Sequence, residues 1–349
     1  MQNLRLSIEN VGAINKANIN LSGLCVIAGK NDTGKSTVGK LIMAIIKAQG
    51  MSSKKSKDEI QYFNRMLDLL FNNQISFSQG SSSIIELKKD DNILCSITIQ
   101  DNNCSKFNNY EQKTRTFLDC TLLQTPFVWD LYDFFHSIMT LEIERKFYRE
   151  TNSDEERNEI NISYPYILWD VYKKLVVVRK HRNTTSQISD DIKNIIKGEF
   201  IKEENKEFAF HRAVNSQILK ISLENVAVGI KQLGILQTLL KNNYITEEGF
   251  FIFDEPENHL HPSWQIEFAK IMIRLSKENI PILITTHSPY MLEALHKYGK
   301  QEKVAVNFHL ANNGEIRQIG DNMKSLNERT LNEIFHILNT SSSILDEIE

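Results

Sequence analysis

The sequence predicts an α/β fold whose core is a mostly parallel sheet. Short, continuous apolar runs occupy residues 24–28, 250–253 and 280–284, a pattern typical of strands that are buried on both faces. Helical patterns at 263–276 and 327–338 separate or follow these runs. Strands that alternate with helices build parallel sheets. The 349 residues, of which 41% are hydrophobic and 24% charged, can form a large core without disulfides or metals.

An antiparallel β portion is expected near the N-terminus. Residues 3–9 alternate between polar and apolar side chains, as a strand with one buried face does. Residues 83–88 and 93–99 are predicted to be the two strands of a hairpin, joined by a short Asp-Asp-Asn turn. Residues 59–72 have a helical pattern, whereas the polar residues 101–116 are expected to form a loop.

The middle of the chain differs in composition from both ends. Residues 130–204 are charge-rich, helix-like and low in glycine and proline. We therefore expect a helical insertion between an N-terminal part (1–129) and a C-terminal part (205–349) of one α/β domain. In the C-terminal part strand character returns, and a helix is expected from Gly229 to Lys241.

The charge balance limits the partners of the protein. A net charge of −3 excludes a polybasic nucleic-acid coat, although a local basic patch is compatible with it. One such patch lies in the helical insertion and could contact nucleic-acid phosphates, or could be a solvated helix face. Its residues are Lys173, Lys174, Arg179, Lys180, His181 and Arg182.

The cysteines and the N-terminus indicate the compartment. Cys25, Cys95, Cys104 and Cys120 include no C-x-x-C pair, so zinc-ribbon and redox motifs are excluded, and scattered free thiols suit a reducing cytosol. The N-terminal segment alternates instead of forming a secretory apolar run, and no stretch approaches 18 apolar residues. We expect a cytoplasmic protein without a membrane partner.

The strongest motif is a P-loop. Residues 29–37 match G-x-x-x-x-G-K-[ST], with a buried strand before them and a helical pattern after them. Glycines let backbone N–H groups converge on phosphate oxygens, and the helix N-terminus adds the positive end of its dipole. Lys35 would reach the β- and γ-phosphates, and the Ser36 hydroxyl would bind Mg²⁺. The residues expected to hold the nucleotide are Gly29, Asn31, Asp32, Thr33, Gly34, Lys35, Ser36 and Thr37.

A second motif supplies carboxylates. Four apolar residues, 250–253, precede Asp254 and Glu255, which is a Walker B pattern. The carboxyl end of a buried parallel strand brings these side chains to the crevice beside the P-loop. Asp254 would hold Mg²⁺, directly or through water, and Glu255 would polarise the attacking water as general base.

A third motif completes a family resemblance. His287 follows the buried strand that comes after Walker B. Together with residues 254–262 (D-E-P-E-x-H-L-H-P) and 285–289 (T-T-H-S-P), the motifs resemble the ABC-type ATPase clan of SMC/RecF/OLD-like heads. Within that clan the sequence is similar to the ATPase subunits of bacterial anti-phage defence systems of the Septu, PARIS and OLD types.

The resemblance implies further roles and partners. His287 would contact the γ-phosphate, and Gln124 would be a Mg²⁺ ligand on the loop between Walker A and the signature helix. Gly229 would belong to the signature motif, where Val228 replaces the usual serine and cannot donate a side-chain hydrogen bond. The cofactors would be ATP and Mg²⁺, the activity slow ATP hydrolysis, and the assembly at least a head-to-head homodimer. Because the segment after His287 is short, we expect the effector, a nuclease or toxin, to be a separate chain.

Other functions remain open at this point. A RecF-like ATPase of DNA repair would bind DNA directly and with strong salt dependence. A transporter ATPase subunit and a nucleotide-binding scaffold that barely hydrolyses ATP are further alternatives. The pair His259 and His261 could suggest a metal, but no third ligand is near in sequence and the pair occupies the place of the ABC D-loop.

Overall fold

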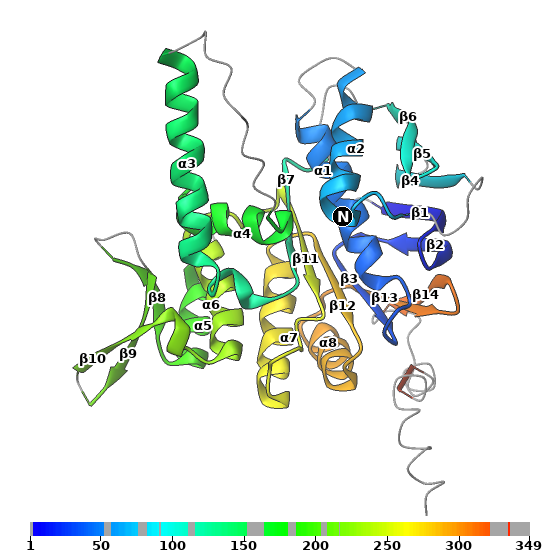
Figure 1. Ribbon diagram of the computed structural model, residues 1–349. Helices are drawn as coiled ribbons and strands as arrows, with labels where there is room; N and C mark the ends of the chain where they lie inside the picture. The colour runs from blue at the N-terminus through cyan, green and yellow to red at the C-terminus, as the bar shows by residue number, and fades with distance from the viewer. Residues whose placement is uncertain are drawn as a thin grey trace, which may run out of the picture. The chain divides into compact units, whose positions relative to one another are not determined.

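The protein divides into two compact units. The computed structural model describes residues 3–51, 57–75, 82–90, 92–110, 116–151, 164–180, 186–203, 208–215, 217–321 and 334–335. The first unit combines Met1–Gln124 with Ile245–Glu349, and the second unit comprises Thr125–Tyr244 (Figure 1). The second unit is wider than the insertion expected at 130–204, because it also includes the helix after residue 228.

The core of the first unit is parallel, as expected. Neighbouring strands run in the order β13, β3, β12, β11, β7, and all four pairings are parallel. Every residue of β3, β11 and β12 is buried, which confirms that the apolar runs are strands covered on both faces. The bounds are β3 (Leu24–Gly29), β7 (Asp119–Leu123), β11 (Gly249–Asp254), β12 (Ile282–Thr286) and β13 (Val306–Asn312).

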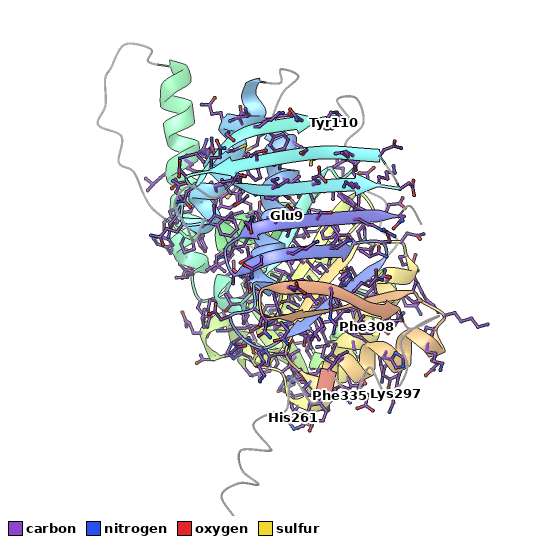
Figure 2. The ribbon with its side chains drawn as sticks, turned by 90° about the vertical axis from the view of Figure 1, so that its right-hand side faces the viewer. Glu9, Tyr110, His261, Lys297, Phe308 and Phe335 are labelled. Atoms are coloured by element: carbon purple, nitrogen blue, oxygen red, sulfur yellow. The ribbon has the colours of Figure 1, made fainter. Side chains whose placement is uncertain are left out.

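The same sheet continues into a portion whose pairings are antiparallel except for the short parallel contact of β14 with β2. Beyond β13 it follows the order β14, β2, β1, β4, β5, β6, and Figure 2 shows these strands side by side from near Phe308 to near Tyr110. In β1 the apolar side chains Leu4, Leu6 and Ile8 are buried while Arg5 and Glu9 are exposed. The bounds are β1 (Leu4–Val11), β2 (Ile14–Asn20), β4 (Ser83–Lys89), β5 (Asn92–Gln100), β6 (Asn103–Asn109) and β14 (Glu315–Asp321).

One segment of this portion differs from the expectation. The β4–β5 hairpin was predicted, but residues 103–109 form strand β6 instead of a loop. Its sequence, NCSKFNN, has two buried side chains, Cys104 and Phe107. An edge strand needs little apolar surface, so its pattern is weak.

Two helices of the first unit, α7 and α8, begin with recognisable caps. The side chains of His261 and Ser288 accept hydrogen bonds from the first turns of α7 and α8, and proline follows each cap. Helix α8 was not predicted, and of the helix expected at 327–338 only residues 334–335 are described, as helical. The bounds are α1 (Lys35–Met51), α2 (Lys57–Phe71), α7 (Pro262–Lys277) and α8 (Pro289–Gln301).

The second unit packs helices and a small sheet around aromatic side chains. Trp129 stacks on Phe200 with ring centroids 4.9 Å apart, and Trp169 stacks on Tyr172 at 5.5 Å. The helices are α3 (Tyr132–Thr151), α4 (Tyr166–Val176), α5 (Ser186–Ile196) and α6 (Val228–Lys241). The antiparallel sheet, in the order β10, β9, β8, comprises β8 (Glu199–Lys202), β9 (Phe208–Val214) and β10 (Gln217–Ser222).

All four cysteines are free and buried. Burial raises the pKa of the Cys95 thiol to about 12 and that of Cys104 to about 11. Within the described helices, none has the length and apolarity that crossing a bilayer requires.

Candidate nucleotide-binding site

The loop between β3 and α1 is folded tightly on itself. Gly34 has a φ of +84°, a conformation that side chains rarely adopt, and a Cβ added at Gly29 would lie 2.5 Å from the carbonyl oxygen of Ala311. Thr33 Oγ1 donates to the carbonyl oxygen of Lys30 at 2.8 Å. Lys35 Nζ donates to that same oxygen at 2.6 Å. The motif glycines are therefore required by the backbone path as well as by phosphate chemistry.

A pocket of about 460 Å³ opens over this loop. It brings the P-loop side chains together with Glu255, as the two sequence motifs predict. Phe71 and Gln74, near the end of α2, also line it, and no sequence motif pointed to them. Its lining comprises Gly12, Ala13, Asn31, Asp32, Thr33, Gly34, Lys35, Ser36, Thr37, Phe71, Gln74, Ile75 and Glu255.

Asp254 is the centre of a polar cluster at the end of β11. Its Oδ1 accepts from Ser36 Oγ at 3.0 Å and from Thr285 Oγ1 at 2.5 Å, and its Oδ2 accepts from Gln124 Nε2 at 2.8 Å. These residues meet because β7, β11 and β12 are adjacent parallel strands that end at one edge of the sheet. Thr285 was not among the predicted site residues, although its place one strand over, two residues before His287, could have indicated it.

The cluster suits a magnesium ion bound with a nucleotide. Hydroxyl, carboxylate and amide oxygens are hard donors of the kind Mg²⁺ binds. The lysine ammonium and the backbone at the start of α1 suit the phosphates. Ser36, Asp254 and Gln124 would hold the metal, so the residues present fit the expected cofactors.

Glu255 lies between a lysine and a histidine. Its Oε1 is 3.3 Å from Lys35 Nζ and 3.5 Å from His287 Nδ1, and its Oε2 accepts from Asn258 Nδ2 at 3.3 Å. Burial raises the pKa of this carboxyl, but the Lys35 ammonium, followed by His287 and Asn258, outweighs burial and brings the pKa below its ordinary value. Glu255 is thus a carboxylate whose basicity depends on Lys35.

Residues 24–293, which include all three motifs, match the protein family described as "AAA domain, putative AbiEii toxin, Type IV TA system". The chain belongs to this AAA-domain family. The Septu protein PtuA of Bacillus thuringiensis is 25% identical over 318 residues, which are 83% of this chain and 72% of that protein.

A solved structure shares the fold of this AAA-domain chain. The crystal structure of an SMC head bound to the C-terminal winged-helix domain of ScpA superposes with a TM-score of 0.51 at 15% identity. The match covers 92% of this chain and 98% of that one. The predicted fold class, the likeness in fold to an SMC head and the resemblance to a Septu-type protein are confirmed.

Glu257 is a buried residue of this AAA domain to which the sequence analysis gave no role. Its Oε1 accepts from Thr286 Oγ1 and from the backbone N–H of His287, both at 2.7 Å, and from the N–H of Ser288 at 3.2 Å. Burial raises the pKa of this carboxyl, and the donors from Thr286 and His287 oppose that rise only in part. The signal was the second glutamate of the D-E-P-E string.

The two histidines after Walker B have no metal-site geometry. His261 Nδ1 accepts from the N–H of Ser263 at 3.3 Å and so caps α7. In the described part of the chain, no three His, Cys, Asp or Glu side chains gather as a metal site would require. His261 therefore has a structural role.

The signature residues lie in the second unit of the AAA domain. Val228 and Gly229 form the first turn of α6, and the preceding Ala227 makes no side-chain capping bond. The first N–H groups of a helix lack intrahelical acceptors. Val228 is 38% exposed, so this turn presents an apolar side chain beside its backbone donors.

The basic run of the second unit is largely occupied by internal contacts. Lys174 is buried and pairs with Asp170 at 2.8 Å, and Arg179 lies over the ring of Tyr244 at 4.2 Å. Lys174 therefore fits neither of the two alternatives, a phosphate contact or a solvated helix face. His181 and Arg182 lie outside the described residues.

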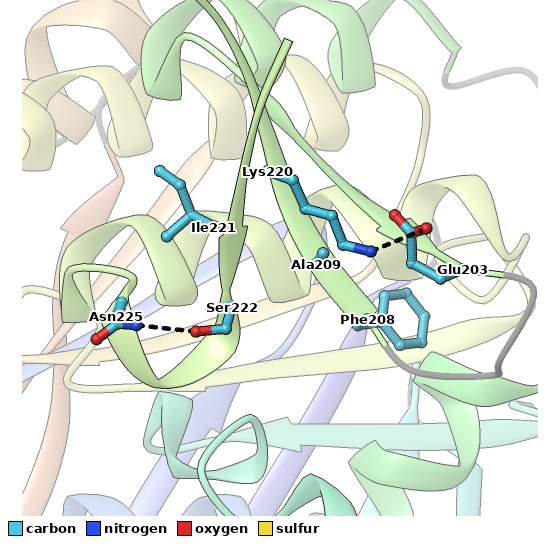
Figure 3. A pocket seen from close by; sticks show the side chains of 7 residues that line it. All are labelled: Glu203, Phe208, Ala209, Lys220, Ile221, Ser222 and Asn225. Carbon is cyan, nitrogen blue, oxygen red and sulfur yellow. Dashed lines mark hydrogen bonds and ion pairs between the residues drawn. The ribbon is translucent and has the colours of Figure 1, made fainter.

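A second pocket, of about 450 Å³, lies on the small sheet of the second unit (Figure 3). Its two charged side chains, Glu203 and Lys220, pair with each other at 3.1 Å. Glu203 also contacts His211 at 2.6 Å, so its charge is already neutralised within the sheet. No sequence motif points to this pocket.

Proposed function

We propose that this chain is an ATP-hydrolysing ABC-type ATPase subunit and a nucleotide-driven dimerisation switch. In this proposal it controls a partner effector, a nuclease or toxin, in bacterial anti-phage defence. The observation that carries the ATPase part is the meeting of Ser36 and Gln124 on Asp254, beside Glu255. The 25% identity with a Septu protein supports the defence context.

Each residue of the site has a role in this proposal. Bound ATP with Mg²⁺ supplies the phosphoryl group and the charge that polarises it. Lys35 donates from Nζ to the phosphates, and the P-loop N–H groups orient them. Ser36, Asp254 and Gln124 position the metal, while His287 donates to the γ-phosphate. Glu255 accepts the proton of the attacking water on its carboxylate.

In this proposal Lys35 links nucleotide binding to the strength of Glu255 as a base. Its Nζ lies 3.3 Å from Glu255 and is the largest of the influences that lower the pKa of that carboxyl. A lysine that turns to the phosphates leaves Glu255, and the pKa of Glu255 then rises. Glu255 would therefore become a stronger base only when the pocket is filled.

Dimerisation completes the proposed site. The first turn of α6, with Val228 and Gly229, would reach the phosphates bound by a second copy through its backbone N–H groups. ATP would then favour the closed dimer because it contacts both copies, and hydrolysis would release them.

The ATPase part is tested with the full chain and two variants. Lys35→Ala is expected to weaken ATP binding at least tenfold, because the phosphates lose their cation. Glu255→Gln is expected to keep ATP binding and lose turnover, because the base is removed. Isothermal titration and phosphate release measure both effects, with Lys300→Ala and Glu278→Gln as exposed controls of matching charge change. Unchanged ATP affinity in Lys35→Ala would reject the P-loop role.

The effector part needs a separate experiment. The tagged protein, wild type and Glu255→Gln, is purified from its native operon, and the bound protein and nucleic acid are identified by mass. A stoichiometric nuclease or toxin is the expected result. DNA without a protein partner, lost steeply as salt rises, would instead favour the RecF-like function.

A further inference from the structure

The segment that carries His287 is held by one carboxylate from the neighbouring strand end. Glu257 lies in the turn after β11, and His287 follows β12 directly. Oxygen Oε1 of Glu257 receives three hydrogen bonds, from the side chain of Thr286 and from the backbones of His287 and Ser288. The residue is 5% exposed, so water competes little for these donors.

The other side of this segment is fixed as well. Ser288 Oγ donates to Gln265 Oε1 at 2.6 Å and accepts from the N–H of Met291 at 3.3 Å, which caps α8. Gln265 Nε2 in turn donates to the carbonyl oxygen of Leu260 at 3.1 Å. The backbone at residues 286–288 is therefore bound to the turn after β11 and to the first turn of α7.

The result of these contacts is a defined place for the His287 ring. Nδ1 of His287 lies 3.4 Å from Glu257 Oε1 and 3.5 Å from Glu255 Oε1. Glu257 takes no part in the pocket lining, whereas Glu255 does. The carboxylate of Glu257 thus acts on the histidine and its backbone.

We propose that Glu257 is a positioning residue that holds His287 against Glu255, and that turnover depends on it while nucleotide affinity does not. The inference rests on the proposed ATPase function for its kinetic consequence. Its structural consequence, the place of the His287 ring, stands without it.

Two substitutions of Glu257 distinguish the effect of its hydrogen-bond acceptor from the effect of its charge. Glu257→Ala removes the acceptor of three hydrogen bonds and should lower kcat about tenfold or more, with KM for ATP changed less than about threefold. Glu257→Gln keeps an oxygen at the same distance and should retain kcat within about threefold of wild type. Glu278→Ala, at the far end of α7, is the control for loss of a glutamate from the same unit. Equal loss of kcat and of ATP affinity in Glu257→Ala would overturn the proposal.

A double-mutant cycle tests whether Glu257 acts through His287. Glu257→Ala should have no further effect on kcat in a His287→Ala background, because the ring it positions is gone. Additive losses would show that Glu257 acts independently and would overturn the proposal. Thermal unfolding of each variant identifies any that has lost the fold. If Glu257→Ala has lost it, Glu257→Asp, whose shorter side chain withdraws the acceptor, takes its place in the cycle.

A readout without turnover distinguishes the two proposals. The His287 ring signal in ¹⁵N-histidine spectra, assigned by its loss in His287→Gln, should move in Glu257→Ala and stay in place in Glu278→Ala. A moved signal with no ATP turnover in wild type would reject the ATPase function and keep the positioning role. An unmoved signal would reject the positioning role whatever the turnover.

Discussion

The ammonium group of Lys35 has two acceptors in this structure, the carbonyl oxygen of Lys30 and the carboxylate of Glu255. Lys35 is 3% exposed, so these contacts replace the water that an exposed lysine would bind. A bound phosphate can compete for Nζ because it offers more negative charge than one carboxylate. The place of this ammonium therefore affects the pKa of Glu255, which Lys35 lowers.

A second buried residue, His309, gives the fold a dependence on pH. Its Nε2 accepts from the N–H of Asn20 at 2.9 Å, and its Nδ1 lies 3.3 Å from the carbonyl oxygen of Val26. Burial lowers the pKa of this imidazole from 6.5 to about 4, although the Val26 and Asn307 backbones oppose that shift. The ring is thus neutral in the folded protein at every pH above about 4.

We predict that stability falls as the pH is lowered from about 6.5 to about 4. In this window the unfolded chain binds a proton at His309 that the folded protein does not, which favours unfolding by up to about 3 kcal/mol. Urea unfolding at about pH 7.5, 6, 5 and 4.5 measures how the free energy of unfolding changes with pH. His309→Gln should be less stable at pH 7.5 but show a shallower pH slope; an unchanged slope would contradict the assignment.

Among the elements, α6 and β8 pack tightly against each other at Gly234. A Cβ added at Gly234 would lie 2.0 Å from Cε2 of Phe200. The Phe200 ring cannot move away easily because it stacks on Trp129. Glycine at this position therefore serves helix-to-strand packing, although it costs helix propensity.

Gly234→Ala is predicted to destabilise the protein by about 1–3 kcal/mol, because the added methyl group overpacks the aromatic core. Gly50→Ala in α1 is the matched control, since nothing lies within 4 Å of the added carbon. The control should be neutral or slightly stabilising, as alanine favours the helix. Thermal unfolding compares the two, and equal melting temperatures would contradict the packing argument.

Some elements were predictable from the sequence and others were not. The apolar runs at 24–28, 250–253 and 280–284 predict strands that are buried on both faces, and β3, β11 and β12 are buried in this way. Strands β7, β13 and β14 were not predicted, and β6 was predicted as a loop because most of its residues are polar. Whether such a segment becomes a strand depends on pairing with residues far along the chain.

The candidate site divides in the same way. That Ser36 and Asp254 meet follows from strands that end at one sheet edge. The contacts of Thr285 and Glu257 depend on the register of β11 against β12, in which Asp254 pairs with Thr285. Register is a property of the packed sheet, so the motif strings can indicate these two residues but not the atoms that they contact.

At the scale of the whole molecule, the proposed dimer can be tested at one exposed residue. We predict that Glu255→Gln doubles its mass when ATP is added, because ATP remains bound between two copies. Adding Val228→Arg should abolish the doubling, since a charged side chain at the start of α6 would face the partner. Val178→Arg, at another exposed valine, is the control. Light scattering measures the masses, and a dimer that survives Val228→Arg would reject this interface.

Because all four native thiols are buried, an added surface cysteine can be labelled selectively with a fluorescent dye. Thiolates are the reactive form, and burial holds the pKa of Cys95 and Cys104 at about 12 and about 11, far above that of a free cysteine. A single cysteine placed at the exposed Val178, outside the proposed dimer contact, would then be the preferred target of a maleimide dye in the native protein. Energy transfer between dyes on two copies would follow closing and opening in real time, without a cysteine-free background.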